Sequence, residues 1–383
     1  MKRRHFLASG LAAAALAPRA ARAQFRGFQQ RLTIGINAPL SGAAQDAGQQ
    51  LIAGAQIAID FANQFTPSLN SAFALRLFDT NGQYAQLINN VQFAAGDPTV
   101  VALITAFDGE GIARALPAYS NAQMPLIVPA STTDAITARG YRFVWRLPTR
   151  DSVEGQLYAR FLGDRQRPKM AIAVSQDGVY GGDVMNGFTN QAHSSKFDAD
   201  GYIFSSDKPD FKAAAKRILE RSPDFVFLCG QSSTLGPLLP ALRAAGYKGR
   251  VGACEGFYNT QTIKEYGDAF GDGLISTSFP PLDRIASATQ QLQDFRSRTN
   301  ITIVSAFSYA AAQVVMSAVR RINATNRLAT MTALQTPSSY NTLVGQLIFA
   351  PTGDPVDPNI YFYTIDRGTF RYFAPSHASA FVL

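Results

Sequence analysis

The stretch Pro125–Tyr141 reads Pro-Leu-Ile-Val-Pro-Ala-Ser-Thr-Thr-Asp-Ala-Ile-Thr-Ala-Arg-Gly-Tyr. Its apolar run Leu126–Val128 predicts a short buried strand, which ends at Pro129 because proline cannot donate a hydrogen bond to a sheet. The small and hydroxylated residues Ala130–Thr133 are typical of a helix start with free backbone N–H groups. Ligands bind at the carboxyl ends of strands in open α/β sheets, so this loop is a candidate wall for an anionic group. An ordinary strand–turn–helix junction would show the same pattern.

The segments on both sides of this stretch alternate between strand-like and helix-like patterns. Before it, apolar runs and helical spacing predict strands at 32–37, 73–78 and 100–105 and helices at 52–61, 84–95 and from Gly109. After it, the same signals predict strands at 170–174, 202–204, 225–228 and 251–254 and helices at 182–194, 211–220 and 235–245. A helix at 306–322 and strands at 347–349, 360–365 and 370–372 complete the chain. Alternation with short links predicts doubly wound parallel sheets, here in two similar units that meet near Pro148.

The first residues have the composition of an export signal. A basic start, Lys2–Arg4, precedes the small-residue apolar run Ala8–Ala17, and Ala21-Arg22-Ala23 has the form of a cleavage site. The order Arg-Arg-x-Phe-Leu is similar to a twin-arginine signal, although a general secretory signal with an incidental arginine pair also fits. Either signal predicts export to the periplasm and a mature chain that begins at Gln24.

Removing this leader changes the charge of the protein. The full chain has 35 Lys and Arg against 27 Asp and Glu, and residues 1–23 hold five of the bases and no acid, which leaves a net charge of +3. No Lys/Arg-rich run remains, so nucleic acid is not an expected partner. No later segment is uniformly apolar over 18 residues, so we expect the mature chain to be soluble. About 360 residues exceed one typical core, which favours two lobes.

The sequence holds no motif that would indicate an enzyme. It has no phosphate-binding P-loop, no Gly-x-Gly-x-x-Gly dinucleotide loop and no Gly-x-Ser-x-Gly nucleophile motif. His193 and His377 lack metal-ligand spacing, so we expect no catalytic residue, metal or cofactor. Cys229 and Cys254 would both enter an oxidising compartment, where they could pair or serve as small buried hydrophobic residues.

Four predicted strand ends carry groups that suit a zwitterion. Gly109 offers a bare N–H at a helix start, and Ala130–Thr132 offer amides, a carbonyl and hydroxyls. Tyr180 lies among glycines, and Glu255 places a carboxylate just past a strand. Each has an ordinary alternative: Tyr180 could cover a helix end, and Glu255 could cap a helix or face water.

The chain resembles the periplasmic binding proteins of the leucine/isoleucine/valine-binding type over nearly all of residues 31–372. The resemblance rests on the segments Ala38–Gly42 with Gly48 and Gly54-Ala55, Pro129–Thr132 with Thr137–Tyr141, Tyr180-Gly181, Asp224–Val226, Ala244–Gly246 and Glu255-Gly256. It implies two doubly wound α/β lobes joined by a three-strand hinge, with crossings near Thr149, Ser278 and Tyr340. The implied lobes are residues 24–148 with 279–340 and residues 149–278 with 341–383. Such proteins close on a small molecule and deliver it to an inner-membrane permease of an ABC importer.

By this resemblance, Gly109 and Thr132 would bind a ligand carboxylate. The Ala130 carbonyl, the Thr132 hydroxyl and Glu255 would bind an ammonium group, and Tyr180 would pack on the ligand. The full set of predicted ligand-binding residues is Gly109, Ala130, Ser131, Thr132, Tyr180, Gln231 and Glu255. The chain also departs from the family: Ala47 and Gln231 replace pocket aromatics, Gly109 replaces a serine that often stands there, and the disulfide of the first lobe is missing.

The sequence therefore predicts a monomeric periplasmic solute-binding protein for an amino acid or a related carboxylic or amide ligand. A ligand-sensing partner of a receptor or regulator would have the same fold, because a fold does not choose between these functions. A secreted enzyme is the third class, and it lacks a visible nucleophile–base pair.

Overall fold

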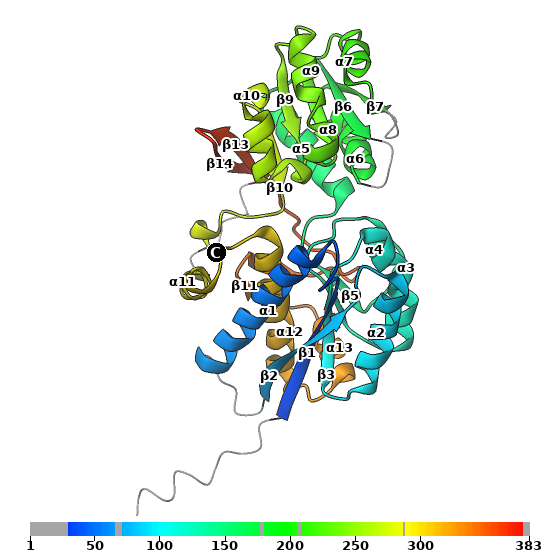
Figure 1. The fold of residues 1–383 in the computed structure, drawn as a ribbon, viewed down its shortest axis with the longest axis vertical. Coiled ribbons are helices and arrows are strands. Elements are labelled where there is room, and N and C mark those ends of the chain that lie inside the picture. The colour runs from blue at the N-terminus through cyan, green and yellow to red at the C-terminus, as the bar shows by residue number, and fades with distance from the viewer. Residues whose placement is uncertain (1–29, 66–70, 177–179, 205–208, 286–287, 378–383) are drawn as a thin grey trace, which may run out of the picture.

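The computed structural model describes residues 30–65, 71–176, 180–204, 209–285 and 288–377. The expected export signal, residues 1–23, lies outside the described residues. The described chain forms two α/β lobes, one above the other in Figure 1, with the N-terminal strands in the lower one. The lower lobe is called the first lobe and the upper lobe the second.

The first lobe is built on a parallel sheet of five strands in the order β2-β1-β3-β4-β5. Its strands are β1 (Gln30–Ala38), β2 (Ser71–Asp79), β3 (Val100–Thr105), β4 (Leu126–Val128) and β5 (Val144–Arg146). Every residue of β3 is buried, because helices cover both faces of a parallel sheet. Its helices are α1 (Gln45–Phe65), α2 (Tyr84–Gly96), α3 (Gly109–Asn121), α4 (Ala135–Ala138), α11 (Thr289–Arg298), α12 (Ile303–Ile322) and α13 (Arg327–Gln335).

Helix α12 is the core helix of the first lobe. It is long and apolar enough to span a membrane by composition, but 72% of its apolar window is buried inside the protein. Its partner is α1, and the two backbones approach so closely that a Cβ on Gly54 would lie 2.0 Å from the Ser305 carbonyl oxygen. The hairpin β11 (Ser339–Thr342) and β12 (Gly345–Ile348) also packs on α12. These segments join the first lobe although they follow the second in sequence.

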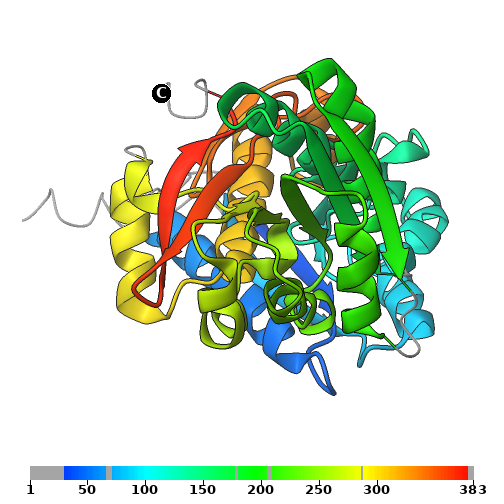
Figure 2. The same ribbon diagram turned by 90° about the horizontal axis from the view of Figure 1, so that it is seen from above.

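The second lobe is built on a seven-stranded sheet in the order β14-β13-β10-β9-β8-β6-β7. Five strands are parallel: β6 (Met170–Gln176), β7 (Asp198–Phe204), β8 (Phe225–Cys229), β9 (Arg250–Ala253) and β10 (Leu274–Thr277). The antiparallel hairpin β13 (Tyr361–Asp366) and β14 (Thr369–Pro375) extends it at one edge, visible in red in Figure 2. Its α-helices are α5 (Asp151–Arg165), α6 (Gly182–Ala192), α7 (Phe211–Leu219), α8 (Ser232–Leu235), α9 (Leu238–Ala244) and α10 (Gly267–Phe270). Short 3₁₀-helices are η1 (His193–Ser195), η2 (Glu255–Phe257) and, in the segment after β10, η4 (Leu282–Arg284), and η3 (Thr262–Tyr266) is a π-helix.

This architecture confirms the predicted fold class of two α/β lobes with doubly wound sheets, with the antiparallel edge of the second sheet as an addition. Helix α5 was not among the helices predicted from the sequence pattern. It packs closely on α6, where a Cβ on Gly155 would lie 2.0 Å from the Val184 carbonyl oxygen and one on Gly187 would lie 2.0 Å from the Ser152 carbonyl oxygen. A helix with buried glycine and acidic residues, among them Glu154, does not show a clean apolar stripe.

The connections between the lobes meet at Thr149. Its backbone N–H donates to the Ser278 hydroxyl oxygen at 3.1 Å, and its own hydroxyl donates to the Asn359 carbonyl oxygen at 2.8 Å. Thr149 precedes α5, Ser278 follows β10 and Asn359 precedes β13, so one residue ties together all three described segments between the lobes. Such a junction allows two lobes to rotate about a small set of backbone torsions.

The third crossing lies later in the chain than the expected position near Tyr340. Tyr340 and Leu343 are buried in the core of the first lobe, and the Val356 N–H still donates to the Ile348 carbonyl oxygen at 2.8 Å. The chain therefore leaves the first lobe between Val356 and β13. Tyr340 and Leu343 explain this shift, because their side chains are buried in the core of the first lobe, where β11 packs on α12, before the chain crosses.

Candidate functional site

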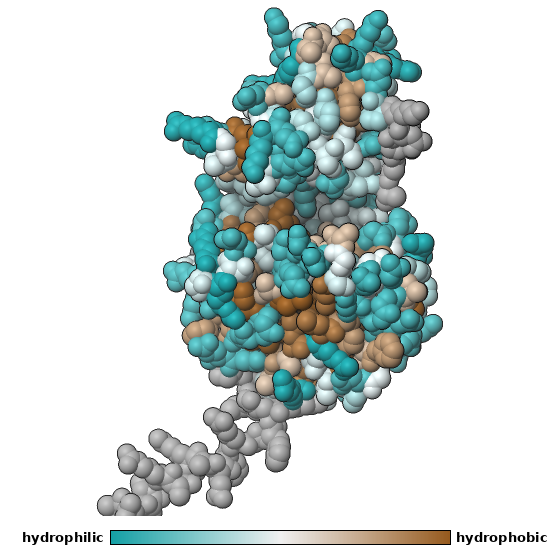
Figure 3. Space-filling view, viewed as in Figure 1, coloured by the Kyte–Doolittle hydropathy of each residue, from teal (hydrophilic) through white to brown (hydrophobic). Residues whose placement is uncertain are grey.

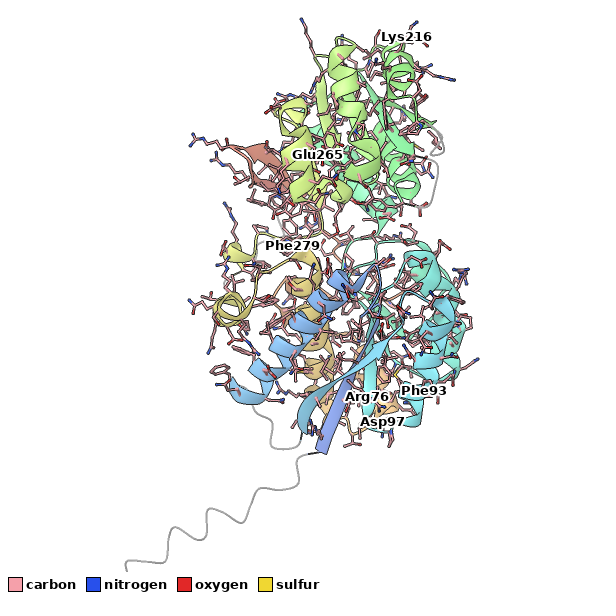
Figure 4. All side chains as sticks on the ribbon, in the orientation of Figure 1. Arg76, Phe93, Asp97, Lys216, Glu265 and Phe279 are labelled. Carbon is pink, nitrogen blue, oxygen red and sulfur yellow. The ribbon has the colours of Figure 1, made fainter. Side chains whose placement is uncertain are left out.

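A cleft of about 410 Å³ lies between the two lobes. The first lobe lines it with Phe107, Gly109, Ala130, Ser131, Thr132, Thr133, Ile303 and Val304, and the second with Tyr180, Gln231, Glu255, Gly256, Tyr258 and Asn259. All seven residues that the sequence nominated as ligand-binding thus lie on the walls of one cleft. Figure 3 shows the narrow waist between the lobes, and Phe279 lies at the same level in Figure 4.

The loop from Ala130 to Asp134 presents its backbone amides as free donors. It begins after β4, and Ala130 is exposed while Ser131 and Thr132 are half-buried. Within the described part of the chain, no group accepts a hydrogen bond from the backbone N–H of Ser131, Thr132 or Thr133. Consecutive unpaired N–H groups make a concave donor surface that suits an anion.

Gly109 contacts this loop at the first turn of α3. The Asp108 side chain caps the helix by accepting from the Gly111 N–H at 2.7 Å. A Cβ on Gly109 would lie 1.9 Å from the Thr133 hydroxyl oxygen and 2.9 Å from the Ser131 hydroxyl oxygen. The side chains of Ser131 and Thr133 therefore occupy the space that a serine at position 109 would need, which gives a physical reason for this departure from the family.

Tyr180 turns its hydroxyl into the second lobe and leaves its half-buried ring on the cleft. The hydroxyl oxygen accepts from the Gly256 N–H at 3.1 Å and lies 3.4 Å from the Cys254 sulfur. Burial raises the pKa of Tyr180 well above its ordinary value, so the hydroxyl stays neutral. The ring can contribute an apolar face to a ligand but no free hydroxyl.

Glu255 is the one charged side chain among the described residues that line the cleft. Its Oε2 accepts from the Ser278 N–H at 2.7 Å and from the Thr277 hydroxyl at 3.1 Å, so the carboxylate is held by the second connection between the lobes. Burial raises the pKa of Glu255, while these hydrogen bonds favour the ionised form. The other carboxylate oxygen, Oε1, accepts no hydrogen bond from the described residues.

Glu154 lies directly behind Glu255. Its Oε1 accepts from the Glu255 N–H at 2.9 Å and from the Ser276 hydroxyl at 2.6 Å. Burial and the neighbouring Glu255 charge raise the pKa of Glu154 well above its ordinary value. Two adjacent buried carboxyls do not both ionise readily, so the pair carries less than two charges, and Glu255 is the member that lies on the cleft wall where a ligand cation could meet it.

Several residues of the cleft wall were not predicted from the sequence. Phe107 and Tyr258 follow predicted strand ends, so their positions beside Gly109 and Glu255 could have nominated them. Tyr258 is fixed by a stacked contact with Phe370, whose ring centroid lies 4.4 Å away. Ile303 and Val304 begin α12 and reach the cleft only through the tertiary fold. These residues give the cleft an apolar wall beside its polar groups.

The two cysteines are free and buried. They lie at the ends of the neighbouring parallel strands β8 and β9, whose register pairs Leu228 with Ala253. The Cys254 sulfur accepts from the Gly230 N–H at 3.1 Å, and burial raises the pKa of both thiols. Of the two roles that the sequence left open, the structure has the cysteines as small buried side chains behind Tyr180.

Comparison with known proteins gives the following relatives. The family model for periplasmic binding proteins matches residues 31–369. Leu/Ile/Val-binding protein homolog 3 of Brucella melitensis biotype 1 is 25% identical over 345 residues, which cover 88% of this chain and 92% of that protein. The leucine binding protein LivK of Thermotoga maritima superposes with a TM-score of 0.75 at 21% identity, over 90% of this chain and 98% of that one. A solute binding protein of an ABC transporter from R. palustris, solved with benzoate, has a TM-score of 0.71 at 17% identity, over 90% and 96%.

Proposed function

The chain belongs to the periplasmic binding protein family, whose members are solute-binding proteins and not enzymes, and from this we propose that it captures an amino acid for an ABC importer. The observation that carries the proposal is the pairing of two opposite kinds of group across one cleft. Free amides of the Ala130–Asp134 loop stand in the first lobe, and the carboxylate of Glu255 stands in the second. This arrangement suits a ligand with a carboxylate at one end and an ammonium group beside it.

We assign the ligand groups as follows. The carboxylate accepts from the amides at Gly109 and Thr132, with Ser131 beside them. The ammonium donates to the Ala130 carbonyl, the Thr132 hydroxyl and Glu255. Tyr180 packs its ring on the ligand, and the exposed Gln231, which makes no side-chain cap at the start of α8, faces the ligand side chain.

The cleft composition favours an amine-bearing ligand over a simple aromatic acid. No cationic side chain lines the described cleft to balance a second negative charge beside Glu255. The apolar wall of Phe107, Tyr258, Ile303 and Val304 suits an apolar ligand side chain. Ala47 is exposed and does not line the cleft, so no side chain at this position takes the place of the family's aromatic residue. The cleft therefore accepts a wider range of ligand side chains.

In this proposal the chain acts outside the inner membrane. The leader at residues 1–23 directs export, cleavage near Ala23 releases a monomeric periplasmic protein, and the closed, liganded form is delivered to the permease. Support for the location comes from the family, whose members are periplasmic binding proteins.

A thermal-shift panel tests the proposed function. The mature chain is mixed with the proteinogenic L-amino acids, their amides, benzoate and 3,4-dihydroxybenzoate. A ligand that binds only the folded state raises the melting temperature by mass action, equivalent to about 4 kcal/mol at a thousandfold excess over Kd. We expect at least one L-amino acid to do so. A response to the aromatic acids alone would remove the ammonium subsite, and no response at all would contradict the function.

Ligand binding should also close the cleft. The proposed carboxylate donors lie in the first lobe and Glu255 in the second, so a ligand that touches both stabilises the closed state by its preference for that state. Rotation about the junction at Thr149 would bring the lobes together. Small-angle scattering with and without a saturating ligand from the panel should therefore show a smaller radius of gyration for the complex. An unchanged scattering curve with tight binding would indicate a rigid, preformed pocket instead.

A further inference from the structure

Arg146 is a fully buried cation directly beneath the Ala130–Asp134 loop. It ends β5, and its side chain is 0% exposed. Its Nη1 donates to the Thr132 carbonyl oxygen at 2.9 Å and to the Thr133 carbonyl oxygen at 2.6 Å. Its Nε and Nη2 donate to Asp354 Oδ1 at 3.0 and 2.6 Å, and Nη2 also donates to the Thr137 hydroxyl. None of the proposed ligand contacts involves this arginine.

These contacts help to fix the direction of two peptide groups, together with the Asp151 N–H, which donates to the Thr132 carbonyl oxygen at 3.0 Å, and the Ile136 N–H, which donates to the Thr133 carbonyl oxygen at 3.3 Å. In a trans peptide the C=O and the N–H of the next residue point in opposite directions. Because Arg146 binds the Thr132 and Thr133 carbonyl oxygens, the N–H groups of Thr133 and Asp134 point away from it, and Thr133 lies on the wall of the cleft. Within the described residues neither of these N–H groups has an acceptor, so both are available to an anion.

We propose that Arg146, held by Asp354, is a positioning residue that aims the amides of this loop at the ligand carboxylate. The inference rests on the proposed function, because it assigns a carboxylate to this end of the cleft. It adds the N–H groups of Thr133 and Asp134 to the donors of that subsite. It also makes the carboxylate subsite depend on Asp354, which lies 208 residues after Arg146 in the chain.

Asp354 is needed because a buried guanidinium is costly without a counter-charge. The segment that carries Asp354 lies against β5, where the Arg146 N–H donates to the Gly353 carbonyl oxygen at 2.9 Å. A Cβ on Gly353 would lie 1.9 Å from the Val144 carbonyl oxygen, so the two backbones are in close contact at this glycine. The planar fork of arginine can serve two carbonyls and a carboxylate at once, which the single ammonium of lysine cannot do with the same geometry.

The test compares two ligands in each variant by calorimetry. One is the L-amino acid that binds the wild-type chain most tightly in the panel, and the other is its amino alcohol, in which –CH2OH replaces the carboxylate. Arg146→Met should weaken binding of the amino acid by about 10- to 100-fold, by analogy with the loss seen when residues that orient metal ligands are replaced. Binding of the amino alcohol should change much less, and Arg146→Lys should recover only part of the loss.

Further variants keep the test decisive. Asp354→Asn retains the arginine and should also weaken binding of the amino acid more than binding of the amino alcohol, although by a smaller factor. This variant replaces Arg146→Met in the test if Arg146→Met does not fold. Arg76→Ala breaks an exposed ion pair with Asp97 at the base of the same lobe, far from the cleft in Figure 4, and should leave both ligands unaffected. Equal weakening of both ligands, or none in a folded variant, would overturn the proposal.

A further experiment tests the positioning role without any ligand. A crystal structure of the unliganded Arg146→Met or Asp354→Asn chain should show the Thr133 carbonyl turned from its wild-type direction, because its other donor, the Ile136 N–H, lies 3.3 Å away, whereas the Thr132 carbonyl is also held by the Asp151 N–H at 3.0 Å. An unchanged loop in both would contradict the positioning role whatever the chain binds. If instead the loop turns but the wild type binds no amino acid, the positioning role holds and the proposed function fails.

Discussion

Glu255→Gln is expected to weaken binding of an amine-bearing ligand by about 2–5 kcal/mol, or roughly thirtyfold to several-thousandfold in Kd. The carboxylate is half-buried at the cleft, so its attraction to an ammonium group is weakly screened. The amide removes that charge and places either an NH2 group or a neutral oxygen opposite the ligand. Isothermal calorimetry with the amino acid selected by the thermal-shift panel measures the loss.

The rest of the Glu255 environment should tolerate this change. A side-chain amide oxygen can still accept from the Ser278 N–H and the Thr277 hydroxyl, which now bind Oε2. Removal of the Glu255 charge also removes one cause of the raised pKa of Glu154, so the folded chain loses less free energy by burying that carboxyl at neutral pH. The free energy of unfolding of the unliganded protein should therefore stay the same or rise, so the lost affinity cannot be explained by misfolding.

Glu265→Gln is the matched control for this prediction. Glu265 is an exposed acid of the same lobe, outside the cleft lining, where it accepts from the Gln261 amide at 3.1 Å. This variant should bind as the wild type does. If Glu255→Gln binds the amino acid as tightly as Glu265→Gln, the ammonium does not lie at Glu255.

Asp151→Asn is expected to stabilise the unliganded protein near neutral pH by up to about 4 kcal/mol, the free energy that corresponds to its shifted pKa. Asp151 is buried at the first turn of α5, and its Oδ1 has no hydrogen-bond partner among the described residues. Burial raises the pKa of Asp151 from 3.8 to about 7. The Thr132 hydroxyl and Arg146 oppose this shift, and Asp134 and Asp183 add to it.

The sign of the pH dependence follows from proton binding. At pH values between 3.8 and about 7 the folded chain keeps the Asp151 proton, whereas the unfolded chain has released it. The free energy of unfolding therefore falls as the pH rises through this window. At pH values above or below the window, Asp151 binds the same number of protons in both states and contributes no pH dependence. Asparagine cannot ionise, so the variant should match the wild type near pH 4 and exceed it at pH 7–8.

Urea unfolding at several pH values measures this difference. Asp164→Asn, an exposed change on the same helix, is the control and should follow the wild type across the series. A stability difference between Asp151→Asn and wild type that does not change from pH 4 to pH 8 would show that Asp151 titrates normally in the folded chain. Loss of stability in the variant at neutral pH would show that the ionised carboxylate has a favourable partner.

The local pattern of the sequence determined the strands and the loops that follow them. Val100–Thr105 is apolar along its length because both faces of a parallel strand are covered, so its bounds could be predicted as the structure has them. The same topology places the carboxyl ends of parallel strands at one edge. Gly109, Thr132, Tyr180 and Glu255 could therefore be nominated together, each from the few residues after a strand, and the structure brings them to one cleft.

Only the tertiary structure decided which distant groups hold that cleft in shape. The Arg146 guanidinium is neutralised by Asp354, and Thr149 joins Ser278 and Asn359, across separations of 129 to 210 residues. Tyr340 stays with the first lobe because α12 offers it a buried surface, and α5 forms although glycines and acids interrupt its apolar face. Burial of a side chain and neutralisation of a buried charge depend on what the folded chain places beside them, and neighbours in sequence do not supply that information.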